Sequence, residues 1–111
     1  MQEGIIAVYI LTNKKDGTLY IGSSVDLARR IDSHRAKAVK SFTKIYNLAR
    51  LVYIELCETL EQALILERRY KRYLREWKVE MIEKHNPNWD DLSKNLYQDI
   101  EESLGSSPRD L

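Results

Sequence analysis

The sequence predicts an α+β domain in which helices surround a small three-stranded sheet. Two observations carry this prediction: three short stretches show apolar strand patterns, and capped helical patterns follow the second and third of them. The chain has 111 residues, which suits one domain with a modest hydrophobic core. We expect residues 1–100 to form this domain and residues 101–111 to be a frayed C-terminal tail.

The first two strands are predicted to form a β-hairpin. Residues 5–11 are apolar on both faces, as in a strand at the middle of a sheet. Asn, Asp and Gly in residues 12–17 indicate a turn, and Thr-Leu-Tyr-Ile-Gly at 18–22 indicates the second strand. A four-residue loop would place Tyr9 directly opposite Tyr20 on one face of the sheet.

The helix predicted after the second strand runs from Val25 to about Val39. Ser23 or Ser24 is positioned to cap it, and Asp26 completes a capping box with Ser23. Its apolar side consists of Leu27, Ala28, Ile31 and Ala38.

The second half of the chain predicts one more strand and three helices. The strand is expected at residues 51–56, after an irregular link at 41–49. Thr59 and Gln62 form a capping box at the start of the next helix. The three helices are expected at residues 60–74, 75–84 and 90–103.

The charges of the chain are segregated, although the formal net charge is only +1. Residues 1–50 carry nine basic and four acidic side chains, and residues 67–87 carry seven basic and four acidic ones. Residues 88–111 carry two basic and six acidic ones. Two basic blocks are typical of a protein that binds polyanions, but solvent-exposed helix faces have the same composition.

The composition excludes several classes of protein. Cys57 is the only cysteine in the sequence, so there is no internal disulfide, which suits the cytoplasm. Cys57, His34 and His85 show no zinc-ligand spacing, and we expect no structural zinc. No apolar run approaches the roughly 20 residues that span a bilayer, and the N-terminus lacks the pattern of a signal peptide.

Several residues in the first 34 suit a site for phosphate. Gly22 lies between a strand and a helix, where a ligand can approach the backbone and the helix N-terminus. Asp26, Arg30 and His34 are spaced four apart on one helix face, and the Arg30 guanidinium can hold phosphate oxygens. The same residues also have structural interpretations: a packed tyrosine pair, a bend at Gly22, and an exposed ion pair between Asp26 and Arg30.

Glu67 interrupts the apolar stripe of its helix, which Leu60, Leu64, Tyr70 and Leu74 continue on either side. An unpaired buried carboxylate costs several kcal/mol, so Glu67 either has a cation partner or lies at an opening in the core. Either Mg²⁺ with water ligands or a buried salt bridge to a Lys or Arg would supply the cation.

The motifs are AVYIL at 7–11, LYIG at 19–22, DLARRIDSH at 26–34 and ALILERR at 63–69. In this order and spacing they resemble the GIY-YIG nuclease superfamily, and most of all its small stand-alone bacterial members. The resemblance covers roughly residues 6–98. The first motif reads Ala-Val-Tyr where the family has Gly-Ile-Tyr, so its tyrosine is retained.

The resemblance implies a three-stranded antiparallel sheet flanked by helices, and metal-dependent hydrolysis of phosphodiester bonds in DNA. The implied catalytic residues are Tyr9, Tyr20, Arg30, His34 and Glu67. A tyrosine would act as general base and Arg30 would clamp the phosphate, while Glu67 would hold one Mg²⁺ or Mn²⁺.

The resemblance and the basic side chains also imply contacts to substrate. The candidates are Gly22, Ser23, Lys37, Lys40, Lys44 and Asn86, with Arg68, Lys71 and Arg72 as further contacts to the nucleic-acid backbone. Ser23 stands where some members carry a lysine, which leaves the site with one positive charge fewer.

The expected partner is DNA, with RNA as the alternative, and we expect no membrane association. A protein partner for targeting, in DNA repair or recombination, would suit a chain that has no room for an appended DNA-binding module. The first alternative function is a nucleic-acid-binding module of the same fold that cuts weakly or not at all. The second is a protein-interaction domain, and the oligomeric state is open.

Overall fold

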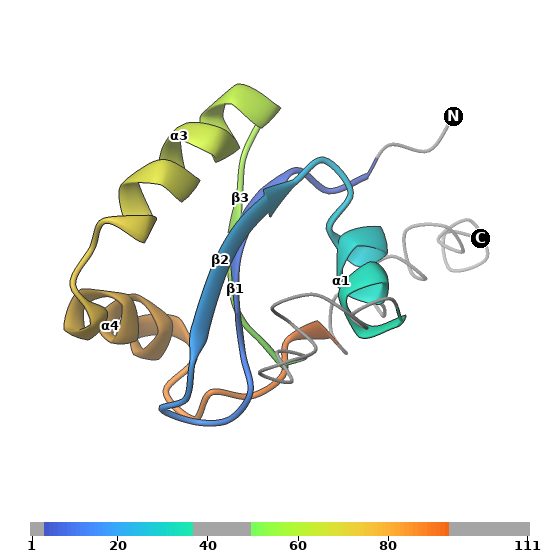
Figure 1. Cartoon of the computed structure of the whole chain (residues 1–111). Helices are drawn as coiled ribbons and strands as arrows, with labels where there is room; N and C mark the ends of the chain where they lie inside the picture. The colour runs from blue at the N-terminus through green and yellow to red at the C-terminus, as the bar shows by residue number, and fades with distance from the viewer. Residues whose placement is uncertain (1–3, 37–49, 94–111) are drawn as a thin grey trace, which may run out of the picture.

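The computed structural model describes residues 4–36 and 50–93. These residues form a three-stranded antiparallel sheet with helices on both faces (Figure 1). The elements are β1 (Ala7–Thr12), β2 (Leu19–Ser24), α1 (Leu27–Ala36), β3 (Arg50–Leu56), α3 (Leu60–Lys71) and α4 (Arg75–His85). The predicted α+β fold with its three-stranded sheet is confirmed. The predicted link at 41–49, most of the helix at 90–103 and the tail at 101–111 lie outside the described residues.

β1 is the central strand, as its apolar run predicts, in a sheet with the order β2-β1-β3. All six of its residues are buried. Tyr9 and Leu11 pack with Leu27 and Ile31 of α1 on one face of the sheet. The other face of β1 packs with Tyr70, Ile82 and Trp89, in and after α3 and α4. The strand thus separates two hydrophobic clusters, with α1 on one side and α3 and α4 on the other (Figure 1).

The hairpin register differs from the predicted one by two residues. Tyr9 pairs with Gly22 and Leu11 pairs with Tyr20, so the two tyrosines share a face but are not directly opposite. The reason is that the turn extends to residue 18: the N–H of Thr18 donates to Asn13 Oδ1 at 3.0 Å. Asp16 takes a positive φ of 62° in this turn, which a short polar side chain tolerates.

The start of α1 also differs from the prediction. The helix begins at Leu27, two residues later than expected. Ser24 Oγ accepts a hydrogen bond from the N–H of Asp26 at 3.0 Å, and the Asp26 carboxylate in turn accepts from the N–H of Arg29 at 3.4 Å. The prediction that Ser23 caps the helix is wrong, because Ser23 belongs to β2 and its hydroxyl donates to Glu67.

The capping box of α3 is confirmed, but the side chain of Gln62 accepts from the residue before the N-cap and not from the N-cap Thr59 itself. The N–H of Gln62 donates to Thr59 Oγ1 at 3.1 Å, while Gln62 Oε1 accepts from the N–H of Glu58 at 2.9 Å. α3 ends at Lys71 and not at residue 74, since the chain turns before α4 begins at Arg75. None of the helices within residues 4–36 and 50–93 is long and apolar enough to cross a membrane.

A carboxylate on β3 helps to attach α3 to the sheet. Glu55 Oε1 accepts hydrogen bonds from the phenols of Tyr53 and Tyr70, both at 2.7 Å. Burial, together with the hydrogen bond to Glu55, raises the pKa of Tyr70 to about 12. The same two causes raise the pKa of Tyr53. Both tyrosines are therefore neutral donors at physiological pH, and the hydrogen bond of Tyr70 links α3 to β3.

The chain after α4 is held against β3 by Asn86. Its side-chain amide donates to the carbonyls of Val52 at 3.1 Å and Asp90 at 2.9 Å, and its Oδ1 accepts from the N–H of Asp90 at 3.0 Å. Asn86 is 5% exposed, and Trp89 in the same turn is fully buried at a positive φ of 58°. The amide thus satisfies backbone groups that fix how the turn enters the core.

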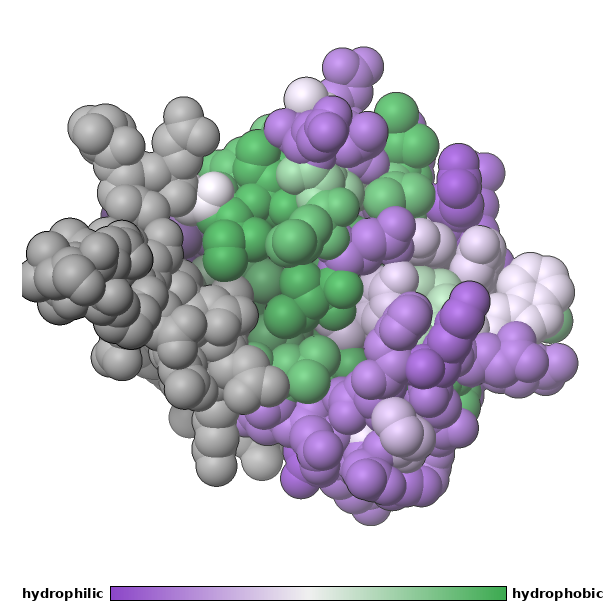
Figure 2. Space-filling view, turned by 180° about the vertical axis from the view of Figure 1, so that it is seen from behind, coloured by the Kyte–Doolittle hydropathy of each residue, from purple (hydrophilic) through white to green (hydrophobic). Residues whose placement is uncertain are grey.

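Seen from behind, apolar residues form a band across the middle of the molecule, with hydrophilic residues beside it (Figure 2). Leu56, at the end of β3, is the most exposed large hydrophobic residue of those described, at 71%. The sheet is thus less completely covered at its β3 edge than at its centre.

Replacing Asn86 with alanine is expected to lower the free energy of unfolding by about 2–4 kcal/mol, because buried backbone groups lose their partners. Urea denaturation measures this change. Asn88→Ala, an exposed position in the same turn, is the matched control and should change stability by less than about 0.5 kcal/mol. Equal effects of the two substitutions would contradict the role given to Asn86.

The stability of the fold is expected to decline above about pH 10. A tyrosine whose pKa is higher in the folded than in the unfolded chain stabilises the fold fully below the unfolded value of 10.0. That contribution is lost as the pH rises through the folded pKa, at up to about 1.4 kcal/mol per pH unit. Urea denaturation between pH 9 and pH 12 should show a shallower decline for Tyr70→Phe than for the wild type. Parallel declines would show that Tyr70 titrates as in the unfolded chain.

Candidate active site

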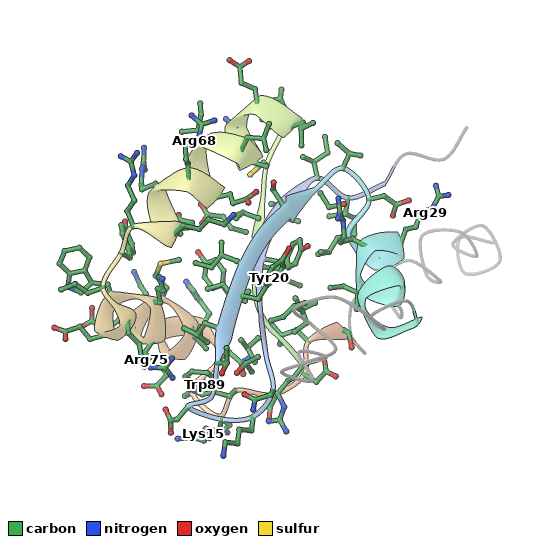
Figure 3. All side chains as sticks on the ribbon, in the orientation of Figure 1. Lys15, Tyr20, Arg29, Arg68, Arg75 and Trp89 are labelled. Carbon is green, nitrogen blue, oxygen red and sulfur yellow. The ribbon has the colours of Figure 1, made fainter. Side chains whose placement is uncertain are left out.

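Two tyrosines of the hairpin lie side by side on the face of the sheet that α1 covers. The rings of Tyr9 and Tyr20 have centroids 6.5 Å apart and planes at 43°. Tyr9 is 1% exposed, whereas Tyr20 is only partly buried. Figure 3 shows Tyr20 between β2 and α1. The pair therefore combines one buried phenol with one that solvent reaches.

Gly22 makes room for the phenol of Tyr9. A Cβ atom at position 22 would lie 2.6 Å from Tyr9 Oη and 2.8 Å from Tyr9 Cζ, which no side chain tolerates. Because Tyr9 belongs to the central strand and Gly22 to the edge strand β2 of the described sheet, the hydroxyl lies over the backbone of β2. The glycine is needed for this close approach, since its φ is not positive.

Glu67 approaches the same edge from α3, on the other face of the sheet. The hydroxyl of Ser23, the residue after Gly22, donates a hydrogen bond to Glu67 Oε1. Lys71 Nζ lies 2.6 Å from Glu67 Oε2, one helical turn further along α3. The Glu67 side chain is 19% exposed, whereas that of Lys71 is 54% exposed. The carboxylate in the apolar stripe thus lies at an opening of the core, with an ion-pair partner.

The surroundings of Glu67 keep it ionised. Burial by itself would raise the pKa of the carboxyl group, but the hydrogen bonds from Lys71 and Ser23 and the charges of Lys71 and Arg30 lower it below its ordinary value. A carboxylate that is ionised and partly open to solvent is a suitable ligand for a hard divalent cation.

The electrostatics of Tyr9 connect the residues of the site. Burial is the main cause that raises the pKa of its phenol, and the neighbouring Tyr20 and Glu67 raise it further. The charge of Arg30, an exposed residue of α1, acts in the opposite direction. Tyr9, Tyr20, Arg30 and Glu67 therefore share one electrostatic environment, although they come from both strands of the hairpin and from two helices.

The remaining candidates have different positions. His34 falls in α1, one turn after Arg30, and its side chain lies outside the described residues, as do Lys37, Lys40 and Lys44. Asn86 contacts β3, the opposite edge strand from β2, and its amide is fully engaged there. The structure therefore does not bring Asn86 to the tyrosines, and shows it in a structural position.

Glu67 is the carboxylate that could hold a metal ion beside the tyrosines. Within residues 4–36 and 50–93 there is no group of three or more His, Cys, Asp or Glu side chains that could hold a metal ion. Mg²⁺ is commonly held by one or two carboxylates, with water and phosphate oxygens as the other ligands. Glu67 fits that mode of binding, provided that Lys71 moves away from it.

Two side chains of this site contact Glu67 in ways that the sequence analysis did not predict. Ser23 is a predicted substrate contact, but its hydroxyl also orients Glu67. Lys71 is predicted to contact the nucleic-acid backbone, but it also forms an ion pair with Glu67. The four-residue spacing between Glu67 and Lys71 is the sequence signal for the ion pair. The link between Ser23 and Glu67 has no sequence signal, because 44 residues separate them.

The sequence profile of the GIY-YIG catalytic domain matches residues 5–80, which contain every element of this site. Among curated proteins, UPF0213 proteins of Staphylococcus aureus strains Mu3, Mu50 and N315 are each 36% identical over 75 residues, covering 68% of this chain and 90% of theirs. No solved structure matches the chain. The chain therefore belongs to the GIY-YIG catalytic domain family, which supports a function of the nuclease type.

Proposed function

We propose that this protein is a metal-dependent endonuclease that hydrolyses phosphodiester bonds in DNA. The observation that supports it best is the meeting of two tyrosine phenols and an ionised carboxylate at Gly22 and Ser23, on the edge strand of the sheet. A phosphodiester lying along this edge would reach the phenols from one side and the carboxylate from the other. The membership of a catalytic domain family agrees with this use of the site.

Glu67 is the residue that would hold one Mg²⁺ or Mn²⁺. The ion supplies Lewis-acid chemistry, which polarises the scissile phosphate and stabilises the departing 3′ oxygen. Ser23 holds the carboxylate in orientation through its hydroxyl. Lys71 would have to leave the carboxylate for a divalent cation to be held there, and its exposed ammonium group would then be available to a phosphate oxygen.

The two tyrosines have different roles in this proposal. The raised pKa of Tyr9 keeps its proton in place near neutral pH, so Tyr9 acts as a hydrogen-bond donor that orients the attacking water. Tyr20 is the more accessible phenol and takes the proton from that water. Tyr20 must be ionised to accept this proton, and the transfer returns it to the neutral phenol. Arg30 stabilises the phenolate before the transfer and clamps the phosphate through its guanidinium group. His34 follows Arg30 by one turn and adds a second contact to the phosphate.

Further basic residues extend the contact with the nucleic acid in this proposal. Gly22 serves the site indirectly, because the phenol of Tyr9 occupies the space over it. Lys37, Lys40 and Lys44 follow α1 in the chain with positive charges for neighbouring phosphates. These contacts position the strand without reading its sequence. We therefore propose a substrate chosen by structure more than by base sequence.

Glu67→Gln and Tyr20→Phe are each expected to reduce Mg²⁺-dependent cleavage by about 100-fold or more, since each removes several kcal/mol of transition-state stabilisation. Gel assays on plasmid, single-stranded and branched DNA, and on RNA, measure this loss. Glu61→Gln, an exposed glutamate in the first turn of the same helix, is the matched control and should cut like the wild type.

The assay also tests the alternative functions. Undiminished cleavage by folded Glu67→Gln protein would show that Glu67 is not the metal ligand. If the folded wild type binds DNA but cuts none of the substrates, the protein is a nucleic-acid-binding module instead. Circular dichroism of each variant establishes that it is folded.

Gly22→Ala is expected to reduce cleavage at least about tenfold, because the new methyl group displaces the phenol of Tyr9 from its position over β2. It should also lower the free energy of unfolding by about 1–3 kcal/mol, as overpacking does. Cleavage rate and urea denaturation are measured together. Val25→Ala, an exposed position just after β2, should change neither. Normal cleavage by Gly22→Ala would contradict the role of this close approach.

A further inference from the structure

A groove with arginine and aromatic side chains lies on α3 and α4, and the proposed mechanism does not use it. We call it the Arg–Trp groove. It has a volume of about 450 Å³ and is lined by Ile65, Arg68, Arg69, Arg72, Tyr73 and Trp77. A second hollow of about 440 Å³ shares Tyr73 and Trp77 with it and extends along α4 to Lys84, past Glu80 and Met81. Trp77 therefore stands where two adjoining hollows meet.

The three arginines of the groove are exposed side chains of α3 and of the residue that follows it. Within residues 4–36 and 50–93, no carboxylate forms an ion pair with Arg68, Arg69 or Arg72. By contrast, Lys71 of the same helix is paired with Glu67. Three neighbouring guanidinium groups that form no ion pair within the described residues favour an anionic ligand, and their planar donors match phosphate oxygens.

An aromatic side chain is exposed among these charges. Trp77 is 46% exposed, although tryptophan is usually well buried. Its ring meets Tyr73 edge-on, with centroids 5.4 Å apart and planes at 85°, and Tyr73 meets Tyr70 at 5.3 Å. Tyr70 is buried and hydrogen-bonded to Glu55. The indole is thus supported by a row of aromatic rings that begins in the core.

The groove and the proposed active site lie on neighbouring faces of one helix. Glu67 and Lys71 lie on the side of α3 that faces β2. Arg68 and Arg72 each follow one of them by a single residue, which rotates them by about 100° around the helix axis. In Figure 3 the Arg68 side chain points away from the sheet. Figure 2 shows hydrophilic residues with near-neutral ones between them on the side of α3 and α4.

We propose that the Arg–Trp groove binds single-stranded nucleic acid, with phosphates on the arginines and an unpaired base stacked on Trp77. Stacking requires a base with an accessible face, which an intact duplex does not offer along its length. This inference rests on the proposed function, because that function places the cleaved bond beside Glu67. A strand that leaves Glu67 would pass Lys71 and enter the groove at Arg68 and Arg72. The preferred substrate is therefore nucleic acid with an unpaired segment beside the cleavage position.

The test uses the two tryptophans of the chain. Trp77 is exposed and Trp89 is fully buried, so quenching of intrinsic fluorescence by an added ligand reports on Trp77. The full-length wild type is titrated in EDTA with a twelve-nucleotide oligothymidylate, with a duplex of the same length, with vesicles of phosphatidylserine and phosphatidylcholine, and with polyglutamate. Fluorescence anisotropy of the labelled oligonucleotide gives the affinity of each variant.

The oligothymidylate is expected to quench the fluorescence and to bind more tightly than the duplex. Trp77→Leu should weaken its binding about 5- to 100-fold, as expected for the loss of one stacked base. The double variant Arg68→Ala, Arg72→Ala should reduce the slope of log affinity against log salt by about 1.4, for two phosphate contacts to a single strand. The matched double variant Lys14→Ala, Lys15→Ala removes the same charge from the β1–β2 turn and should leave affinity and quenching nearly unchanged.

Three results would overturn the proposal: wild-type affinity in Trp77→Leu, equal quenching by the duplex, or quenching by the vesicles or polyglutamate alone. The groove and the nuclease can fail separately. If single strands bind in a way that depends on Trp77 but no substrate is cleaved in Mg²⁺, the proposed nuclease function is refuted and the proposed role of the groove stands. If the wild type cleaves duplex DNA and Trp77→Leu binds single strands as tightly as the wild type, the proposed role of the groove is refuted and the nuclease function stands.

Discussion

The close approach of Tyr9 to Gly22 is the contact on which the candidate site depends. Tyr9 belongs to the most buried strand of the sheet, and a Cβ atom at position 22 would collide with its hydroxyl. The missing Cβ lets a phenol anchored in the core lie over the backbone of the edge strand. The ring is therefore held in place by packing. Such a support suits a catalytic group, because little conformational entropy is lost when substrate binds.

The edge strand also brings together groups from opposite faces of the sheet. Successive residues of a strand point to opposite faces, so Gly22 and Ser23 serve different sides. Gly22 accepts the phenol from the face that α1 covers, and Ser23 donates to Glu67 of α3 on the other. A site at the centre of the sheet could not combine the two faces, since neighbouring strands would separate them. At the edge only the backbone of β2 intervenes.

One helix serves three purposes in this arrangement. Ala63 and Tyr70 of α3 are buried against the sheet, Glu67 and Lys71 face the edge of β2, and the arginines face solvent. The ion pair between Glu67 and Lys71 neutralises a carboxylate that would otherwise be costly so close to the core. It also sets a condition for binding a divalent cation, because Lys71 must give up its partner. The three faces follow from helical periodicity, which separates neighbouring residues by about 100°.

The sequence by itself determined the α+β class, the central position of β1 and the set of motifs, because these depend on local apolar patterns and short spacings. The residues 5–11 are apolar on both faces, and the strand they form is covered on both sides. Glu67 was identified as a carboxylate in need of a cation partner or an opening in the core from its place in an apolar stripe. The four-residue spacing is compatible with Lys71 as its ion-pair partner, whereas tertiary structure alone decided that Ser23 donates to the same carboxylate. It also decided the register: the side-chain amide of Asn13 holds Thr18 within the turn, which sets Gly22 opposite Tyr9. Contacts of this kind join residues whose packing the linear pattern does not specify, so the site's geometry became visible only with the folded chain.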